Sequence, residues 1–355
     1  MPDKPVLAGL RQNELKDLLA SYPPFRSAQI HKWILRGAES FEEMSSLPLS
    51  MRKELAESYI LFPGEVSSEL RDRDGTIKLG IKLEDGAVIE TVMLRDGSNG
   101  KIQQKKIEGK TVRKTACLSS QAGCPLACVF CKTGALGYNR NLTAQEICVQ
   151  FLQLRKLEPD ISHIVVMGMG EPLLNMEEVA KALDFFMDPE GLGISKRRVT
   201  LSTSGIVKGI QDLAERGPDV RLALSLTTAR EELRCRLMPV SRDNPLISVK
   251  EALLEYQKKV DRRITLEIVL LGGINTGKED ALAAADFSIG LNAVFNLIPW
   301  NPINSLEFEN VSLRAPTPSE TAGFIAALEN LGAKVTLRTG KGCGISGACG
   351  QLGVV

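Results

Sequence analysis

The sequence predicts an α/β protein whose main body is a partial (β/α)6 barrel, preceded by a small N-terminal helical domain and a short β-rich connector. Apolar residues recur at helical spacing up to residue 60, two strand-like runs then flank a turn, and from about residue 112 strand-like and helix-like segments alternate. Alternating strands and helices imply a parallel sheet. The domains are therefore expected at residues 1–60, 61–111 and 112–338, followed by a glycine-rich tail at 339–355.

The composition of the chain bears on its size class and location. With 355 residues, 43% of them hydrophobic, the chain is long enough for one barrel-sized domain and a smaller one. It has no apolar run near the roughly 18 residues of a membrane span, and its amino terminus has no signal-peptide pattern. Eight cysteines, three of them in one short loop, favour a reducing compartment over a disulfide-bonded scaffold. We expect a cytoplasmic monomer with no membrane partner.

Positive charge is concentrated in a few segments. The net charge of +1 does not by itself indicate a nucleic-acid partner. Residues 101–114, however, carry six Lys or Arg side chains and one Glu, and residues 195–198 and 258–263 are further basic clusters. A solvated surface explains any one of these clusters, but several together favour a polyanionic partner.

The first two domains are predicted from short-range patterns. Prolines within residues 22–24 separate two helices, and a third amphipathic stretch follows at residues 50–60. In the connector, strands are expected at residues 76–82 and 88–94, on either side of a turn at residues 84–86. The apolar residues at helical spacing are Leu10, Leu15, Leu18, Leu19, Ile30, Trp33 and Ile34.

The barrel domain is predicted as a series of strand–helix repeats. Thr143 followed by Glu146 forms a capping box at the start of its first helix, and ligand sites of such a barrel lie at the carboxyl ends of the strands. The last eighteen residues contain six glycines and are expected to be irregular and mobile. The strands are expected at residues 113–119, 161–167, 198–202, 220–226, 263–271, 291–298 and 334–338. The helices are expected at residues 143–157, 176–187, 206–216, 229–237, 247–260, 278–286 and 319–331.

Three closely spaced cysteines, Cys124, Cys128 and Cys131, form a C-x3-C-x2-C loop after the first barrel strand. Iron–sulfur clusters are held by such closely spaced cysteines, and three ligands on a [4Fe–4S] cube leave one iron open. Structural zinc, the alternative, takes four ligands, usually from two C-x2-C pairs, whereas this loop has one pair and no nearby His. The triplet resembles that of the radical S-adenosylmethionine (SAM) superfamily, in which the open iron binds the amino and carboxylate groups of SAM.

Polar residues follow several of the predicted strands. Gly170 and Glu171 end a glycine-rich turn where the backbone can approach a ligand and a carboxylate can accept hydrogen bonds from an ammonium group. Ser202 and Ser225 end the next two strands, and their hydroxyls suit the ribose and carboxylate of SAM, although helix capping is the ordinary role of serine there. Asn301 follows a later strand and suits the edges of adenine or ribose.

Five segments together resemble the RlmN/Cfr family of radical SAM RNA methyltransferases. They are CLSSQAGCPLACVFCKTGALGYNRNLTAQEI, VVMGMGEPLLN, SKRRVTLSTSGI, FNLIPWNP and the terminal ACGQL. The resemblance covers roughly residues 85–353, and residues 1–60 resemble the accessory domain of that family. It implies a radical SAM barrel with a [4Fe–4S] cluster on Cys124, Cys128 and Cys131.

The resemblance also implies a reaction. Family members methylate an adenine carbon, C2 in the RlmN branch and C8 in the Cfr branch, and consume two SAM molecules per turnover. One SAM methylates a tail cysteine, here Cys349, and a second SAM yields the radical that removes hydrogen from that S-methyl group. The resulting carbon adds to adenine, and Cys117 then attacks Cys349, which releases the product and leaves a disulfide bond. Glu90 matches the proton acceptor of the family.

Substrates and partners follow from the same resemblance. The expected substrate is an adenosine of 23S rRNA, with tRNA as a further candidate, and the expected electron donor is a flavodoxin-type protein. The residues expected to bind SAM are Gly170, Glu171, Ser202, Ser225, Leu226, Thr227 and Asn301.

Departures from the family pattern leave alternatives open. Cys343 and Gly347 stand in the tail where the family has an acid and an alanine, and Thr227 stands where it has a histidine. These changes allow a Cfr-like C8 reaction or another RNA target. A radical SAM enzyme acting on a protein or small molecule would need neither Cys117 nor Cys349. A third alternative is a non-catalytic iron–sulfur protein that binds RNA or senses redox state.

Overall fold

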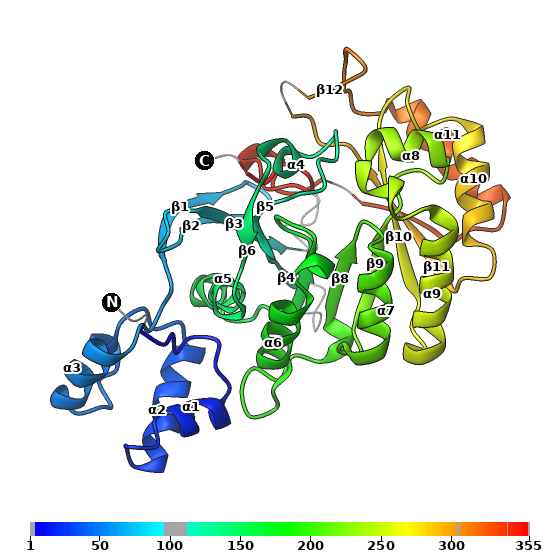
Figure 1. The fold of residues 1–355 in the computed structure, drawn as a ribbon. Helices are drawn as coiled ribbons and strands as arrows, with labels where there is room; N and C mark the ends of the chain where they lie inside the picture. The colour runs from blue at the N-terminus through cyan, green and yellow to red at the C-terminus, as the bar shows by residue number, and fades with distance from the viewer. Residues whose placement is uncertain (1–3, 96–111, 304–305, 339, 354–355) are drawn as a thin grey trace.

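A ten-stranded sheet runs through the protein, in the computed structural model that describes residues 4–95, 112–303, 306–338 and 340–353. Its strand order is β1-β2-β3-β4-β7-β8-β9-β10-β11-β14 (Figure 1). Within this sheet, the neighbouring strands from β4 onward pair in parallel, as predicted, whereas those from β1 to β4 pair antiparallel. The strands are β1 (Glu65–Arg71), β2 (Ile77–Lys82), β3 (Val88–Arg95), β4 (Lys114–Cys117), β7 (His163–Val166), β8 (Val199–Thr203), β9 (Arg221–Ser225), β10 (Ile264–Leu270), β11 (Ala293–Pro299) and β14 (Val335–Leu337).

The connector is part of this sheet and not a separate layer. β3 pairs with β4, so that the antiparallel strands extend the barrel sheet beyond its first parallel strand. The sequence did not predict β1, because every residue of this edge strand is exposed and the chain there lacks alternation between apolar and polar residues. The expected strands at 76–82 and 88–94 correspond to β2 and β3.

Helices cover the outer face of the curved sheet (Figure 1). Apolar side chains of these helices pack on the sheet in one large core, where the Phe151 and Phe186 rings lie 5.2 Å apart. The predicted capping box is present, since the Glu146 amide donates to Thr143 Oγ1 at 3.2 Å and the Thr143 amide donates to Glu146 Oε2 at 2.9 Å. The helices are α5 (Ala144–Leu157), α6 (Met176–Met187), α7 (Val207–Arg216), α8 (Glu231–Leu237), α9 (Leu246–Val260), α10 (Lys278–Ser288) and α11 (Pro318–Asn330).

The amino-terminal unit consists of α1 (Gln12–Leu18), α2 (Pro24–Leu35) and α3 (Leu49–Ser58). It packs against the barrel through α5, where Arg155 donates to the Leu35 carbonyl at 2.8 Å and Lys156 pairs with Glu39 at 3.2 Å. No helix of the described residues is long and apolar enough to cross a membrane.

Short elements that the sequence did not predict surround the cysteine loop. They include the hairpin β5 (Gln121–Gly123) and β6 (Tyr138–Asn141), the helix α4 (Lys132–Leu136), and the pair β12 (Glu307–Phe308) and β13 (Val311–Ser312). The tail is irregular, as predicted, apart from one 3-10 turn at Cys343–Ile345. It lies beside α4, where Thr133 Oγ1 donates to the Leu352 carbonyl at 2.7 Å, so the expected mobile tail is instead anchored to the barrel (Figure 1).

Candidate active site

Two cavities meet inside the barrel. The smaller, of about 160 Å³, is enclosed by the cysteine loop and by the segments that follow β7, β8, β9 and β11. The larger, of about 730 Å³, continues through the barrel toward the amino-terminal ends of the strands, where Arg221 begins β9. Both cavities are lined by Cys131, Glu267, Asn301 and Cys349. A ligand in one cavity is therefore adjacent to a ligand in the other.

The three cysteines of the loop all line the smaller cavity. The loop is closed by a bond from the Cys124 amide to the Gly137 carbonyl at 2.8 Å, and a Cβ at Gly134 would lie only 3.0 Å from the Cys128 nitrogen. Burial raises the pKa of Cys124 to about 12 and also raises the pKa of Cys128 and Cys131. A bound metal reverses this effect, because a coordinating thiol loses its proton.

The donor set fits an iron–sulfur cluster. Three cysteines face one cavity, as a cluster held by three thiolates requires. A cube with several irons requires thiolates around a body of some size, whereas zinc requires them around one point. The arrangement therefore favours the cluster over structural zinc.

Gly170 and Glu171 form one wall of the smaller cavity. Gly170 has φ +100°, and a Cβ there would lie 2.6 Å from the side chain of Gln121, so only glycine fits. Glu171 is buried, and its carboxylate accepts the amide of Ser204 at 2.7 Å and that of Leu173 at 3.2 Å. Burial raises the pKa of Glu171, and these hydrogen bonds oppose the shift. The turn thus holds a carboxylate at the end of β7.

The remaining strand-end residues divide into two groups. Ser202, Ser225 and Asn301 line the smaller cavity, and the two serine Oγ atoms lie 3.4 Å apart. Leu226 and Thr227, in contrast, are buried and line neither cavity. They form the turn after β9, where Thr227 adopts φ +58° and its amide donates to the Glu267 carbonyl. That these two residues bind SAM therefore stays a prediction.

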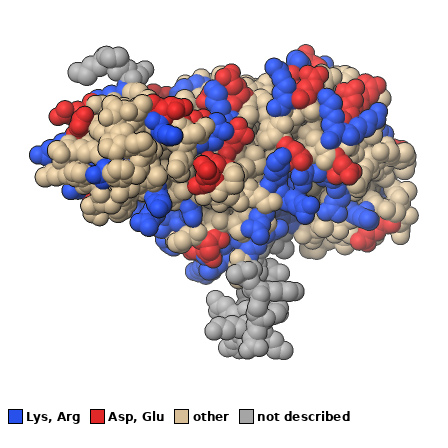
Figure 2. All heavy atoms as spheres, turned by 90° about the horizontal axis from the view of Figure 1, so that it is seen from below, with Lys and Arg blue, Asp and Glu red and all other residues tan. Residues whose placement is uncertain are grey.

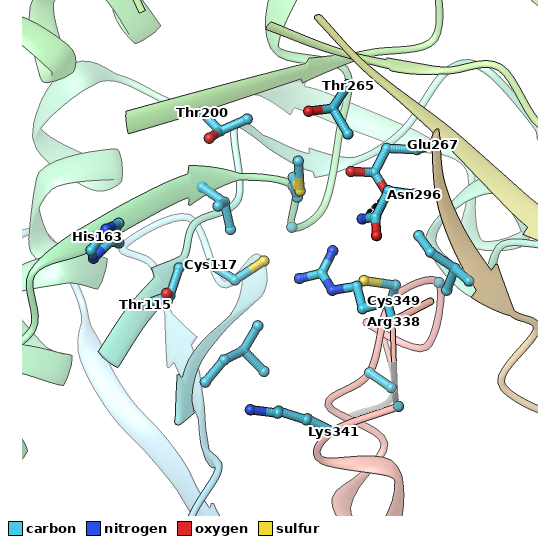
Figure 3. Close-up of a pocket in the computed structure, with 18 of the residues that line it drawn as sticks. Thr115, Cys117, His163, Thr200, Thr265, Glu267, Asn296, Arg338, Lys341 and Cys349 are labelled. Atoms are coloured by element: carbon cyan, nitrogen blue, oxygen red, sulfur yellow. Dashed lines mark hydrogen bonds between the residues drawn. The ribbon is translucent and has the colours of Figure 1, made fainter. Parts of the chain in front are cut away.

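The two predicted exchange thiols face the larger cavity (Figure 3). Cys117 ends β4, and Cys349 projects from the tail, with the guanidinium group of Arg338 drawn between the two sulfur atoms in this view. Burial raises the pKa of Cys117 to about 12, while the positive charge of Arg338 acts in the opposite direction. All eight cysteines are free thiols, and the exposed Cys343 lines neither cavity.

Glu90 lies outside both cavities. Its Oε1 accepts from Lys78 Nζ at 2.9 Å, and its Oε2 accepts from the Gly353 amide at 2.6 Å. Each side chain of this ion pair is about 4% exposed. The residue that the family resemblance implies as proton acceptor thus lies on β3, contacts the tail, and lines neither cavity.

Sequence reasoning missed charged groups in and around the site, and Arg338, which lines both cavities, is one of them. Glu267 lines both cavities, accepts from Asn296 Nδ2 at 2.8 Å, and has a pKa raised by burial. It could have been found, because a charged residue inside the apolar strand β10 is costly unless it has a function or a partner. Arg234 is fully buried and connects two strand ends, donating to the Ser204 carbonyl at 2.6 Å and the Ser225 carbonyl at 3.1 Å.

The mouth of the larger cavity is basic. Seen from below, Lys and Arg side chains gather across the middle of this face of the molecule (Figure 2). Two of the basic clusters expected from the sequence, at residues 195–198 and 258–263, contribute to it, whereas residues 101–111 lie outside the described residues. The arginines that line the cavity at this end, termed the basic rim below, are Arg113, Arg197, Arg198, Arg221 and Arg263.

Known proteins resemble this chain over its whole length. Residues 118–285 match the family model of the radical SAM superfamily, and residues 6–61 match that of the ribosomal RNA large subunit methyltransferase N-terminal domain. A Treponema pallidum protein named probable dual-specificity RNA methyltransferase RlmN is 44% identical over 348 residues, which cover 98% of this chain and 97% of that protein. A Rhodopirellula baltica protein of the same name is 41% identical over 357 residues, which cover 99% of this chain and 91% of that protein. The crystal structure of a radical SAM methyltransferase from Sphaerobacter thermophilus matches with a TM-score of 0.88 at 34% identity, over 98% of this chain and 99% of that one.

Proposed function

Because the chain belongs to the RlmN family of radical SAM RNA methyltransferases, we propose that it methylates C2 of an adenosine in 23S rRNA, with tRNA as a second substrate. The name dual-specificity, which the relatives carry, supports the second substrate. The observation that carries the proposal is that Cys117 and Cys349 line one cavity, directly beside the cavity of the cysteine loop. An electron donor of the flavodoxin type would supply the reducing equivalents.

The smaller cavity is proposed to hold the [4Fe–4S] cluster and SAM. Cys124, Cys128 and Cys131 would ligate the cluster, and Glu171 would accept hydrogen bonds from the amino group of SAM. Ser202, Ser225 and Asn301 would bind its ribose, carboxylate or adenine edges. The cluster, when bound, reduces SAM and so supplies the radical that removes hydrogen from a methyl group on Cys349.

The larger cavity is proposed to hold the target adenine. Cys349 would carry the methyl group as S-methylcysteine and, after losing one hydrogen atom, would form a carbon–carbon bond to adenine. The adduct would then give up one electron, which the oxidised cluster could accept, and the proton that this adenine carbon carried. The Cys117 thiolate would then attack the Cys349 sulfur, so that a sulfur–sulfur bond forms as the bond from sulfur to the transferred carbon breaks. That carbon stays on adenine and becomes a methyl group after taking up a proton. Reduction of the disulfide would restore both thiols.

A direct assay tests the proposed reaction. The protein, reconstituted anaerobically and supplied with SAM, a reductant and an rRNA fragment, is expected to produce 5′-deoxyadenosine, S-adenosylhomocysteine and 2-methyladenosine in the digested RNA. Detection of 8-methyladenosine would instead assign the C8 reaction. SAM cleavage that does not respond to RNA would favour a protein or small-molecule substrate, and absence of SAM cleavage would favour a non-catalytic protein.

The basic rim is proposed to bind RNA phosphates while the target base enters the cavity. Phosphate contacts release counterions, so each one steepens the salt dependence of binding. The variant R197Q/R198Q is expected to weaken RNA binding roughly tenfold near 0.15 M salt and to reduce the slope of log K against log salt by about one to two units. Fluorescence anisotropy of labelled RNA over a salt series measures both quantities.

A matched control removes the same charge from another surface. Lys208 and Arg216 lie on α7, line neither cavity, and pair with Asp212 at 2.8 Å and 3.1 Å. K208Q/R216Q is expected to bind RNA with the affinity and salt slope of the unaltered protein. Equal effects of the two double variants would show that the net charge, and not the rim, controls binding.

A further inference from the structure

We propose that the buried Lys78–Glu90 ion pair is a clamp that positions the tail thiol Cys349, and that Glu90 is a positioning residue and not a proton acceptor. The inference rests on the proposed function only in treating Cys349 as the methyl carrier. It assigns a purpose to the antiparallel part of the sheet, which contributes no residue to the smaller cavity.

The pair is built by neighbouring strands. Lys78 lies on β2 and Glu90 on β3, where Gly80 is the direct partner of Glu90, so the two side chains are diagonal neighbours on one face of the sheet. Their charged atoms lie 2.9 Å apart, and each side chain is about 4% exposed. An ion pair enclosed in this way holds both groups in one geometry, because neither can be released to water without leaving the other buried and uncompensated.

Each member of the pair also holds the tail, on opposite sides of Cys349. Lys78 Nζ donates to the Ser346 carbonyl at 3.4 Å, three residues before the thiol. Glu90 Oε2 accepts from the Gly353 amide at 2.6 Å, four residues after it. Because both contacts go to the backbone, they restrain the path of the chain and not one side chain. The loop that carries Cys349 is thereby fixed at both ends.

Further hydrogen bonds also hold the tail in place. Asp72 and Asp74, in the turn between β1 and β2, accept the amides of Gly344 at 3.0 Å and Gly342 at 2.9 Å. On the barrel side, Asn301 Nδ2 donates to the Cys349 carbonyl at 3.1 Å. The tail therefore lies between the antiparallel strands and the loop that follows β11, with its thiol directed into the cavity (Figure 3).

The surroundings of Glu90 do not suit a proton acceptor. Both of its carboxylate oxygens already accept hydrogen bonds, one from an ammonium group and one from an amide. The residue lines neither cavity, whereas Cys117 lines the larger one. A general base must come within hydrogen-bond reach of the proton that it removes.

The clamp and the proton acceptor make opposite predictions for a set of variants. In the clamp, E90Q or K78M alone leaves one buried charge uncompensated, whereas the double variant K78M/E90Q removes both charges and keeps an acceptor for the Gly353 amide. Each single variant is expected to lower kcat for RNA methylation roughly ten- to a hundredfold by displacing the thiol. The double variant is expected to recover only the part of this loss that comes from the uncompensated charge, because methionine at position 78 cannot donate to the Ser346 carbonyl. A proton acceptor instead requires K78M to stay active and both E90Q and K78M/E90Q to be inactive.

A second measurement reports on the tail without catalysis. Hydrogen–deuterium exchange of the reconstituted protein, without RNA, is expected to show faster exchange of peptide 342–353 in E90Q and K78M. Exchange is expected to be intermediate in K78M/E90Q, which keeps only the contact to the Gly353 amide, and near normal in the conservative variant K78R. Cluster absorbance checks that each variant is folded. Normal tail exchange in both single variants would overturn the clamp. Failure of the unaltered protein to methylate RNA would refute the proposed function, while tail exchange would still decide the clamp.

Discussion

The variant C117A is expected to accumulate a covalent protein–RNA adduct through Cys349. Once the transferred carbon joins adenine to the Cys349 sulfur, only attack on that sulfur releases the product. Cys117 ends β4 and faces the same cavity, with the positive charge of Arg338 favouring its thiolate against the effect of burial. Removing this sulfur takes away the attacking group and leaves the preceding steps intact. A denaturing gel with labelled RNA detects the adduct.

Two variants in the tail complete this experiment. C349A removes the methyl carrier and is expected to give neither adduct nor methylated RNA. C343A is the matched control, because Cys343 lies in the same tail but is exposed and lines neither cavity. It is expected to retain turnover. Loss of methyl transfer in C343A together with its survival in C349A would show that the carrier has been assigned to the wrong cysteine.

The variant C128A is expected to lose the [4Fe–4S] cluster and all SAM cleavage. The three loop cysteines line one cavity, and two thiolates cannot hold a cube that needs three protein ligands. The barrel should remain folded, because its core is formed by apolar contacts between the sheet and the outer helices. Visible absorbance and iron content after anaerobic reconstitution measure the loss, and circular dichroism measures the fold.

C235A is the control for the cluster ligands. Cys235 is a free thiol on α8 that lines neither cavity, so its removal is expected to leave iron content and SAM cleavage unchanged. If C128A still bound about four irons and cleaved SAM, the ligand assignment would be wrong.

The placement of the strands was largely predictable, with one informative exception. Buried parallel strands such as β10 are mostly apolar, and the helices between them carry periodic apolar stripes, so both leave strong local signals. β1 leaves none, because all of its residues are exposed and it joins the sheet by pairing with β2. That pairing is a contact between segments, which a local pattern cannot contain.

The candidate site likewise has features that short sequence segments predict and features that they do not. The spacing of three cysteines pointed to the cysteine loop, and the family resemblance pointed to Cys117 and Cys349. Neither separated Ser225, which lines a cavity, from Leu226 and Thr227, which line neither. One residue along a turn reverses the direction of a side chain, and backbone angles such as the φ of +58° at Thr227 are set by surrounding contacts.

The sequence by itself determined the α/β barrel, the family and the three cysteines that we propose as cluster ligands, since these depend on the order and spacing of residues within short segments. Only the tertiary structure decided that the antiparallel strands join the barrel sheet, that Glu267 faces both cavities, and that Lys78 and Glu90 hold the tail on either side of Cys349. The physical reason is that Glu90 and Gly353 lie 263 residues apart in the chain. Their contact exists only once packing of the sheet has brought both segments together, and no pattern within either segment records it.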